Sequence, residues 1–312
     1  MLILGEKYKF TDKELEELSE KFNNINTILY KNRSPNEVIE EIQILLEKDK
    51  FLLIVLNTKV QVDDSIIKYL TNLKFQVQSK KFKIIAIEHF LEEYLFKCYI
   101  PEDNNDLHYL DDIQGFTPFQ KFLKAFVDTG AMVCLIVVFP FFRHTAKKKI
   151  AEQSPGSLYY KQLRVGLNNR EFKCVKFRSM HENAEKNGAV FAKERDTRIF
   201  AWGERMRKSR IDEIPQMFNI LKREMHFVGP RPERRYWIEK DFEKAIPYYN
   251  QRHVVSPGIT GWAQVMYPYG DSIEDARQKL MYDLYYIKHW SFILEFQIIW
   301  KTIVVISKKK GV

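Results

Sequence analysis

Residues 208–216 of this chain read KSRIDEIPQ, and residues 228–232 read VGPRP. The first segment contains two adjacent acids, Asp212 and Glu213, with three cations close by: Arg207, Lys208 and Arg210. Cations lower carboxylate pKa values, so we expect both acids to be ionised at neutral pH. An ionised pair with a free oxygen suits a hard cation such as Mg²⁺, and arginines suit the phosphates that such a metal accompanies. A solvated, salt-bridged start of a helix is the alternative.

The acidic segment is expected to begin a helix. Ser209 is of a residue type that caps helices, and Pro215 limits how early the helix starts. A helix through Glu213 to about Leu221 would place both acids at its N-terminus, where the dipole and the free amides favour anions.

Two strands are predicted before the acids, at 157–164 and 171–177, and a turn at 166–169 joins them. Lys176 and Arg178 are two residues apart, so they lie on one face of an extended strand. They are either a phosphate clamp or two solvated charges, and the spacing alone does not decide between these.

Residues 131–142 read AMVCLIVVFPFF and carry no charge. The run has about twelve residues, against the roughly twenty that cross a bilayer. It is either a buried core helix or a helix that enters one leaflet, breaks at Pro140 and leaves on the same side. The arm after Pro140, residues 141–149, contains a basic cluster and suits anionic headgroups.

A second apolar segment, residues 292–305, is followed by three lysines at 308–310. This composition, which includes Trp300, is typical of an interfacial helix. Packing of the helix against the core is the alternative.

The N-terminal part of the chain alternates between apolar runs and helical patterns. Strands are predicted at 27–30, 51–56 and 83–87, and helices at 35–46, 63–73 and 89–96. Such alternation indicates a small parallel sheet with helices packed on it. No glycine-rich loop follows any predicted strand, and without one the backbone cannot approach a pyrophosphate. Assembly or regulation is therefore the expected role of this part.

His89 lies among Glu88, Glu92 and Glu93. This grouping allows a metal site, but a solvated helix face is the favoured interpretation. The polar segment 102–106 is predicted to be a linker. It divides the chain into two domains, residues 1–115 and 116–312.

The composition of the chain limits the classes of partner that it can bind. The chain has 312 residues, 45% of them hydrophobic, and a formal charge of +9. Two domains with real cores can form from it, and the charge implies an anionic partner: nucleic acid, a phospholipid surface or a pyrophosphate. The three cysteines are widely separated, which fits a reducing compartment and no disulfide framework. No N-terminal signal peptide is evident.

Further motifs extend from about Phe122 to the C-terminus. They are SPG at 154–156, QLRVG at 162–166, KFRSM at 176–180, PGITGWAQV at 257–265, YPYG at 267–270 and YDLYYIK at 282–288. Together with residues 207–216 and 228–232, their content and order resemble the bacterial sugar transferases. These are monotopic polyprenyl-phosphate sugar-1-phosphate transferases of exopolysaccharide, capsule and O-antigen pathways.

The resemblance implies an α/β chain with a small Rossmann-like N-terminal domain of parallel sheet. This domain has none of the transmembrane helices that larger members carry first. An α+β monotopic catalytic domain with a re-entrant, Pro-broken helix follows it. The implied activity is transfer of a sugar-1-phosphate from a UDP-sugar to polyprenyl (undecaprenyl) phosphate. UMP is released, a phosphosugar is held covalently on an Asp, and Mg²⁺ is the cofactor.

The matching motifs also imply roles for individual residues. Asp212 is the nucleophile, and Glu213 with Asp212 holds Mg²⁺. Phosphate or substrate contacts fall to the matching and neighbouring polar residues, which are Arg231, Lys176, Arg178, Arg164, Arg207, Arg210, Asp196, Arg198, Gln216 and Asp283. Pro140 is the break in the membrane helix.

The implied partners are the UDP-sugar, the polyprenyl phosphate lipid and a bilayer with anionic headgroups, at the cytoplasmic face of the bacterial inner membrane. Downstream glycosyltransferases and further copies of the chain stay open. Arg223, His226 and Met266 stand where the family more often has Gly, Ser and Asn, and could tune substrate choice. A non-enzymatic, membrane-anchored scaffold is the alternative function. Nucleic-acid binding has only the net charge in its favour.

Overall fold

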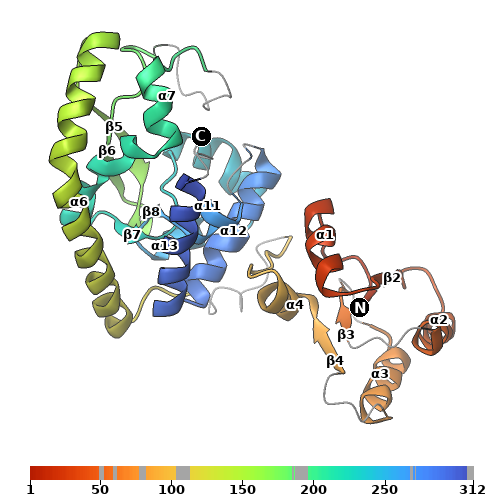
Figure 1. Ribbon diagram of the computed structural model, residues 1–312. Helices are drawn as coiled ribbons and strands as arrows, with labels where there is room; N and C mark the ends of the chain where they lie inside the picture. Colours follow the sequence, from red (N-terminus) through yellow and green to blue (C-terminus); the bar gives the residue numbers. More distant parts are fainter. Residues whose placement is uncertain are drawn as a thin grey trace. The chain divides into compact units, whose positions relative to one another are not determined.

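The computed structural model describes residues 1–48, 53–58, 62–76, 82–102, 113–184, 186, 196–267, 270 and 272–307. Contacts between residues divide the chain into two compact units, Met1–Tyr99 and Ile100–Val312 (Figure 1). Residues 103–106 of the predicted linker lie outside the described residues. The boundary between residues 115 and 116 therefore stays a prediction.

The first unit contains a parallel sheet, as the alternation of strands and helices predicts. Its strand order is β2-β1-β3-β4, and all neighbouring pairs are parallel. The strands are β1 (Leu2–Leu4), β2 (Asn26–Ile28), β3 (Leu53–Leu56) and β4 (Lys83–Ala86). The helices are α1 (Asp12–Lys21), α2 (Pro35–Lys48), α3 (Asp64–Gln76) and α4 (Ile87–Tyr94).

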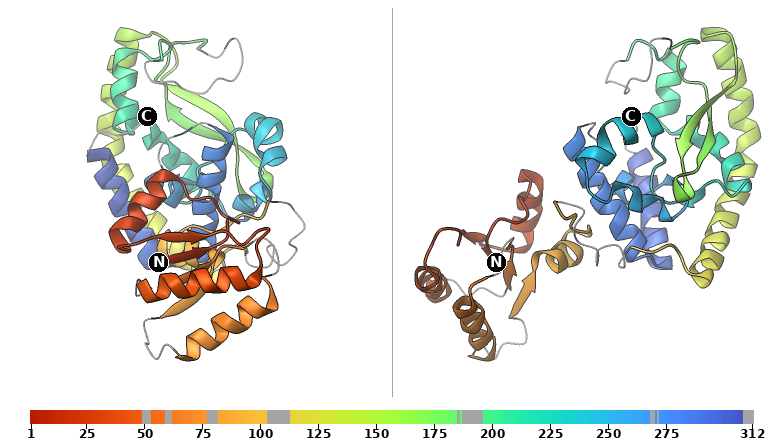
Figure 2. Two further views of the ribbon diagram at one scale, coloured as in Figure 1. Left: turned by 90° about the vertical axis from the view of Figure 1, so that its right-hand side faces the viewer. Right: turned by 180° about the vertical axis from the view of Figure 1, so that it is seen from behind.

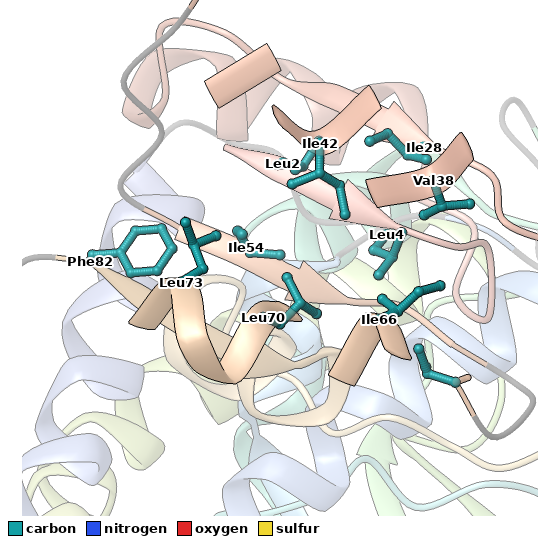
Figure 3. Close-up of a cluster of buried hydrophobic side chains, with 11 residues drawn as sticks. Leu2, Leu4, Ile28, Val38, Ile42, Ile54, Ile66, Leu70, Leu73 and Phe82 are labelled. Carbon is teal, nitrogen blue, oxygen red and sulfur yellow. The ribbon is translucent and has the colours of Figure 1, made fainter. Parts of the chain in front are cut away.

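The sequence analysis missed β1 and α1. β1 has three residues, too few to show a period. Helix α1 does carry a signal, because Thr11 and Glu14 form a capping box at its start. The hydrophobic core of the unit packs Leu2 and Leu4 of β1 and Ile54 of β3 together with side chains from α2 and α3 (Figure 3).

Asn57 closes the carboxyl end of β3. Its side chain accepts a hydrogen bond from the Tyr8 amide at 2.7 Å and donates to the Tyr8 carbonyl at 2.9 Å. The segment that runs from β1 to Tyr8 passes through Gly5 (φ +97°). An added Cβ at Gly5 would lie 2.4 Å from the Asn57 carbonyl oxygen. Open parallel sheets bind ligands at this end, where the strand order reverses. Here the loop after β1 is tied to β3 at that position.

The second unit is mixed α/β, and its first described helix is the long α6 (Pro118–Gln153). The predicted hairpin is confirmed: β5 (Tyr159–Val165) pairs antiparallel with β6 (Glu171–Phe177) across the turn η1 (Leu167–Asn169). The hairpin lies alongside α6 in both figures of the whole chain (Figures 1 and 2).

The other elements of the second unit complete the fold around the hairpin. They are α7 (Ala201–Lys208), η2 (Ile211–Gln216), α8 (Met217–Leu221), β7 (His226–Val228), α9 (Arg235–Trp237), η3 (Ile238–Phe242), α10 (Glu243–Ala245), η4 (Tyr249–Val254), β8 (Gly258–Thr260), α11 (Trp262–Met266), α12 (Ile273–Lys288) and α13 (Phe292–Ser307). Strands β7 and β8 form a short parallel pair.

By length and composition, helix α6 is long and apolar enough to cross a membrane. Only 17% of its most apolar stretch of 18 residues is buried. One stripe, which includes Met132, Leu135 and Phe139, packs on the hairpin and α8. Val137 and Phe141 are about 70% exposed (73% and 69%). The helix continues without interruption past Pro140, and the predicted turn back within one leaflet stays a prediction.

Helix α13 combines both interpretations of the C-terminal segment. Leu294, Glu295 and Ile298 are buried, whereas Ile293 and Trp300 are exposed. The helix therefore packs on the unit with one face and presents apolar side chains on another. The lysines at 308–310 lie outside the described residues.

Candidate active site

The acidic pair lies in a turn of 3₁₀ helix and not at the start of an α-helix. Ser209 follows the end of α7, and its hydroxyl donates to the Arg205 carbonyl at 2.7 Å. The prediction that Ser209 caps the next helix is therefore wrong. Arg210 (φ 54°) takes a left-handed conformation between α7 and η2. Because Pro215 has no N–H to donate, the regular helix α8 begins only after it, at Met217.

Glu213 is buried and surrounded by cations from three elements. Its Oε1 accepts from the Lys176 ammonium at 2.7 Å and from the Arg231 guanidinium at 3.2 Å, and its Oε2 lies 3.6 Å from Arg210. Burial by itself would raise the pKa of Glu213, but Lys176, Arg231 and Arg210 outweigh it and hold the pKa well below its usual range. Glu213 is therefore ionised at every physiological pH.

Asp212 differs from its neighbour. Its side chain is 6% exposed, and it makes no hydrogen bond or ion pair with another side chain in the described part of the chain. Burial, and next the charge of Glu213, raise the pKa of Asp212 to about 6 against the pull of Lys176, Arg207 and Arg231. The expectation that the cations lower both pKa values is correct for Glu213 and wrong for Asp212, because burial is the larger effect there.

Gln264, on α11, joins the two arginines and was not predicted. Its Oε1 accepts from Arg210 at 3.0 Å and from Arg231 at 3.1 Å, while its Nε2 donates to the Ile259 carbonyl at 3.2 Å. It belongs to the PGITGWAQV motif, which was noted for its resemblance and not for chemistry. Its amide fixes two guanidinium groups beside Glu213.

A recess opens to solvent beside this cluster, and the residues that line it are Arg164, Cys174, Lys176, Gln216, Arg231, Pro232 and Gly258. Gln216 is 3% exposed, and its side chain makes no hydrogen bond to another described residue. Three of the lining residues are cations and no acid is among them. The charge of these lining residues suits an anion such as a phosphate.

Asp283 supports the site indirectly, through Arg252. It pairs with Arg252 at 2.6 Å, and Arg252 donates to the Arg231 carbonyl at 2.8 Å and to the Tyr249 hydroxyl at 2.7 Å. Burial raises the pKa of Asp283 to about 6, although Arg252 opposes the shift. Arg164 also holds this turn, since it donates to the Pro232 carbonyl at 3.1 Å.

Four predicted contact residues lie less directly in the cluster. The Arg178 guanidinium binds Ser154, Ser157 and Met180 and ties the end of α6 to β6. Asp196 and Arg198 pair with each other, at 2.5 Å between Oδ2 and an NH group. Arg207 acts on Asp212 through its charge. The structure therefore brings Lys176, and not Arg178, to the acidic pair.

The match to a known family lies within the second unit. The family described as bacterial sugar transferase matches residues 119–309. The chain therefore belongs to the bacterial sugar transferase family.

Several relatives have named activities. An Aeromonas hydrophila protein, UDP-N-acetylgalactosamine-undecaprenyl-phosphate N-acetylgalactosaminephosphotransferase, is 44% identical over 187 residues, which cover 60% of this chain and 44% of that protein. The Xanthomonas campestris pv. campestris UDP-glucose:undecaprenyl-phosphate glucose-1-phosphate transferase is 39% identical over 183 residues, 58% of this chain and 37% of that protein. The exopolysaccharide production protein PSS of Rhizobium leguminosarum bv. phaseoli is 34% identical over 186 residues, 58% of this chain and 92% of that protein. The chain thus spans less than half the length of the first two relatives.

Proposed function

We propose that this chain transfers a sugar-1-phosphate from a UDP-sugar to undecaprenyl phosphate, as the first membrane step of exopolysaccharide, capsule or O-antigen synthesis. The names of two relatives support the reaction, and the name of a third supports exopolysaccharide synthesis. The observation that carries it in this chain is that an Asp212 carboxylate without a hydrogen-bond partner among the described residues stands next to a Glu213 held by Lys176 and Arg231. The same two cations line the anion recess.

The chemistry proceeds in two displacements. An Asp212 oxygen attacks the β-phosphorus of the donor, a P–O bond to Asp212 forms, and the bond to the bridging oxygen breaks as UMP leaves. An oxygen of undecaprenyl phosphate then attacks the same phosphorus and releases the carboxylate. Neither step needs a proton, because all the nucleophiles are anions. Carboxylates act in this way in aspartyl-phosphate enzymes, and Lys176 and Arg231 stabilise charge on the transferring oxygens.

Mg²⁺ is the proposed cofactor, held by Glu213 and Asp212. The donor set fits, because Glu213 Oε2 is buried without a hydrogen-bond partner in the described part of the chain. The described residues contain no cluster of three or more His, Cys, Asp or Glu side chains that could hold a metal ion. Mg²⁺ is usually bound by one or two protein carboxylates together with phosphates of the substrate. When bound, the ion would neutralise charge on the diphosphate.

The location proposed is the cytoplasmic face of the inner membrane, with the chain monotopic and α6 re-entrant. The largely exposed apolar stretch of α6 supports contact with lipid. The exposed cations Arg143, Lys147 and Lys148 near its end support contact with anionic headgroups.

The proposal is tested by incubating the full chain in detergent with a panel of UDP-sugars and Mg²⁺, first without lipid. One donor should release up to one equivalent of UMP per enzyme and leave a phosphosugar on the intact protein, measured by mass. Asp212→Asn should abolish both signals, while Glu152→Gln, on the exposed surface of α6, should retain them. An adduct that persists in Asp212→Asn would exclude Asp212 as the nucleophile. No UMP from any donor, with or without lipid, would favour the scaffold.

A further inference from the structure

Two charged side chains on α6 hold the strand that leads to Arg231. Lys124 and Asp128 are four residues apart and therefore share one face of the helix. Lys124 is fully buried, and its ammonium donates to the Val228 carbonyl at 2.8 Å. Asp128 accepts from the Phe227 amide at 2.7 Å, and its other oxygen lies 2.6 Å from His226 Nδ1. Every residue of β7 is thus bound to α6.

The remaining contacts of Lys124 fix α6 to the C-terminal helices. Its ammonium also donates to the Tyr286 hydroxyl of α12 at 2.9 Å and to Glu295 of α13 at 2.8 Å. Glu295 accepts from Trp290 as well, at 2.7 Å. An ammonium has three protons, and all three are used, so the position of Lys124 is strictly determined.

These contacts take the place of a neighbouring strand. Strand β7 has a single partner in the described chain, β8, so its other edge has backbone groups that need partners. The Phe227 amide and the Val228 carbonyl find theirs on α6. The Val228 carbonyl also accepts from the Tyr286 hydroxyl of α12 at 3.2 Å, so α6 together with α12 sets the lateral position of β7.

A rigid turn connects β7 to Arg231, which lines the anion recess. Gly229, Pro230 and Arg231 follow Val228 directly, and proline fixes its own φ. An added Cβ at Gly229 would lie 2.8 Å from the Ser256 carbonyl oxygen, so the turn packs closely on the segment before β8. Little backbone freedom remains between Val228 and Arg231, whose guanidinium donates to Glu213 at 3.2 Å.

We propose that Asp128, with His226 and Lys124, is a positioning residue for Arg231: it links the membrane-facing helix α6 to the phosphate site. This inference rests on the proposed function for its kinetic consequence and for the contact of α6 with lipid. Asp128 touches no substrate. It acts by holding β7 where Arg231 can reach the donor diphosphate, so that the placement of α6 in lipid and the geometry of the site are mechanically connected.

The kinetic test compares Asp128→Ala, Asp128→Asn and the control Glu152→Ala, which removes an exposed α6 ion pair with Lys149. Asp128→Ala should lower kcat by up to about a hundredfold with a smaller change in the KM for the UDP-sugar, because Arg231 stabilises charge on the transferring oxygens and a small displacement of such a group can cost this much. Asp128→Asn keeps an acceptor for the Phe227 amide and should restore most of the loss. In an Arg231→Lys background the effect of Asp128→Ala should largely vanish, because coupled sites are not additive.

A second measurement needs no transferase activity. Hydrogen exchange of backbone amides in peptides covering residues 226–231 should be about tenfold faster in Asp128→Ala than in Glu152→Ala, both as full chains without substrate. If the wild type released no UMP, the proposed function would fail while this measurement still decided the link. Equal exchange in the two variants, or an undiminished cost of Asp128→Ala beside Arg231→Lys, would overturn the inference.

Discussion

Replacing Asp212 by Asn should make the protein more stable at alkaline pH. The side chain has no described hydrogen bond to lose, and Asn resembles the protonated acid. In the folded chain the pKa of Asp212 is about 6, against an ordinary value of 3.8. The fold therefore favours the protonated form. Its ionisation costs nothing at very low pH, begins to cost stability above pH 4, and reaches its full cost above pH 6.

The size of the effect follows from the shift. Two pKa units correspond to about 3 kcal/mol at pH 8, and the same relation leaves about 1 kcal/mol at pH 4.5. For a unit of this size 1 kcal/mol moves Tm by about 2–4 °C. Asp212→Asn should therefore melt about 6–12 °C above the wild type at pH 8, and about 2–4 °C above it at pH 4.5.

The assay is thermal unfolding in detergent, followed by circular dichroism at both pH values with a chelator present. Glu213→Gln is the matched comparison. The depressed pKa of Glu213 stabilises the fold above pH 4.5 and this stability is lost in acid, so the variant should melt below the wild type at pH 8. Glu152→Gln should leave Tm unchanged. If Asp212→Asn melted at or below the wild type at pH 8, or gained equally at both pH values, the burial argument would be refuted.

Four further outcomes are expected. Gln264→Leu should lower kcat/KM by about tenfold or more, since two guanidinium groups lose a shared acceptor; an unchanged rate would show that the arginines orient themselves. Arg223→Gly should raise Tm by about 2 °C, because Arg223 has φ 59°, which suits glycine; a lower Tm would contradict this. A chain beginning near residue 116 should retain transferase activity in detergent, and a folded, membrane-bound truncation without activity would show that the first unit contributes to the site. Cysteine labelling should find the flanks of α6 on one side of the membrane, with some Pro140→Leu molecules inserting across it; flanks on opposite faces in the wild type would exclude a re-entrant helix.

The sequence by itself determined the local elements. The parallel-sheet unit and the β5–β6 hairpin follow from patterns of neighbouring residues, which fix backbone preferences over a few positions. The motif containing Asp212 and Glu213 and the turn containing Arg231 were recognisable for the same reason, since each is contiguous in the chain. Strand β1 escaped prediction because so short an apolar run becomes a strand through pairing with β2 and β3, which are distant in sequence.

Only the tertiary structure decided which charges meet and how burial changes them. Lys176 reaches Glu213 across 37 positions of the chain, and Lys124 reaches Glu295 across 171. No local pattern records contacts of that range. Burial likewise depends on what packs around a group, which is why the adjacent acids Asp212 and Glu213 have pKa values shifted in opposite directions. The physical reason is that backbone preferences act between neighbours in sequence, whereas desolvation and charge pairing act between neighbours in space.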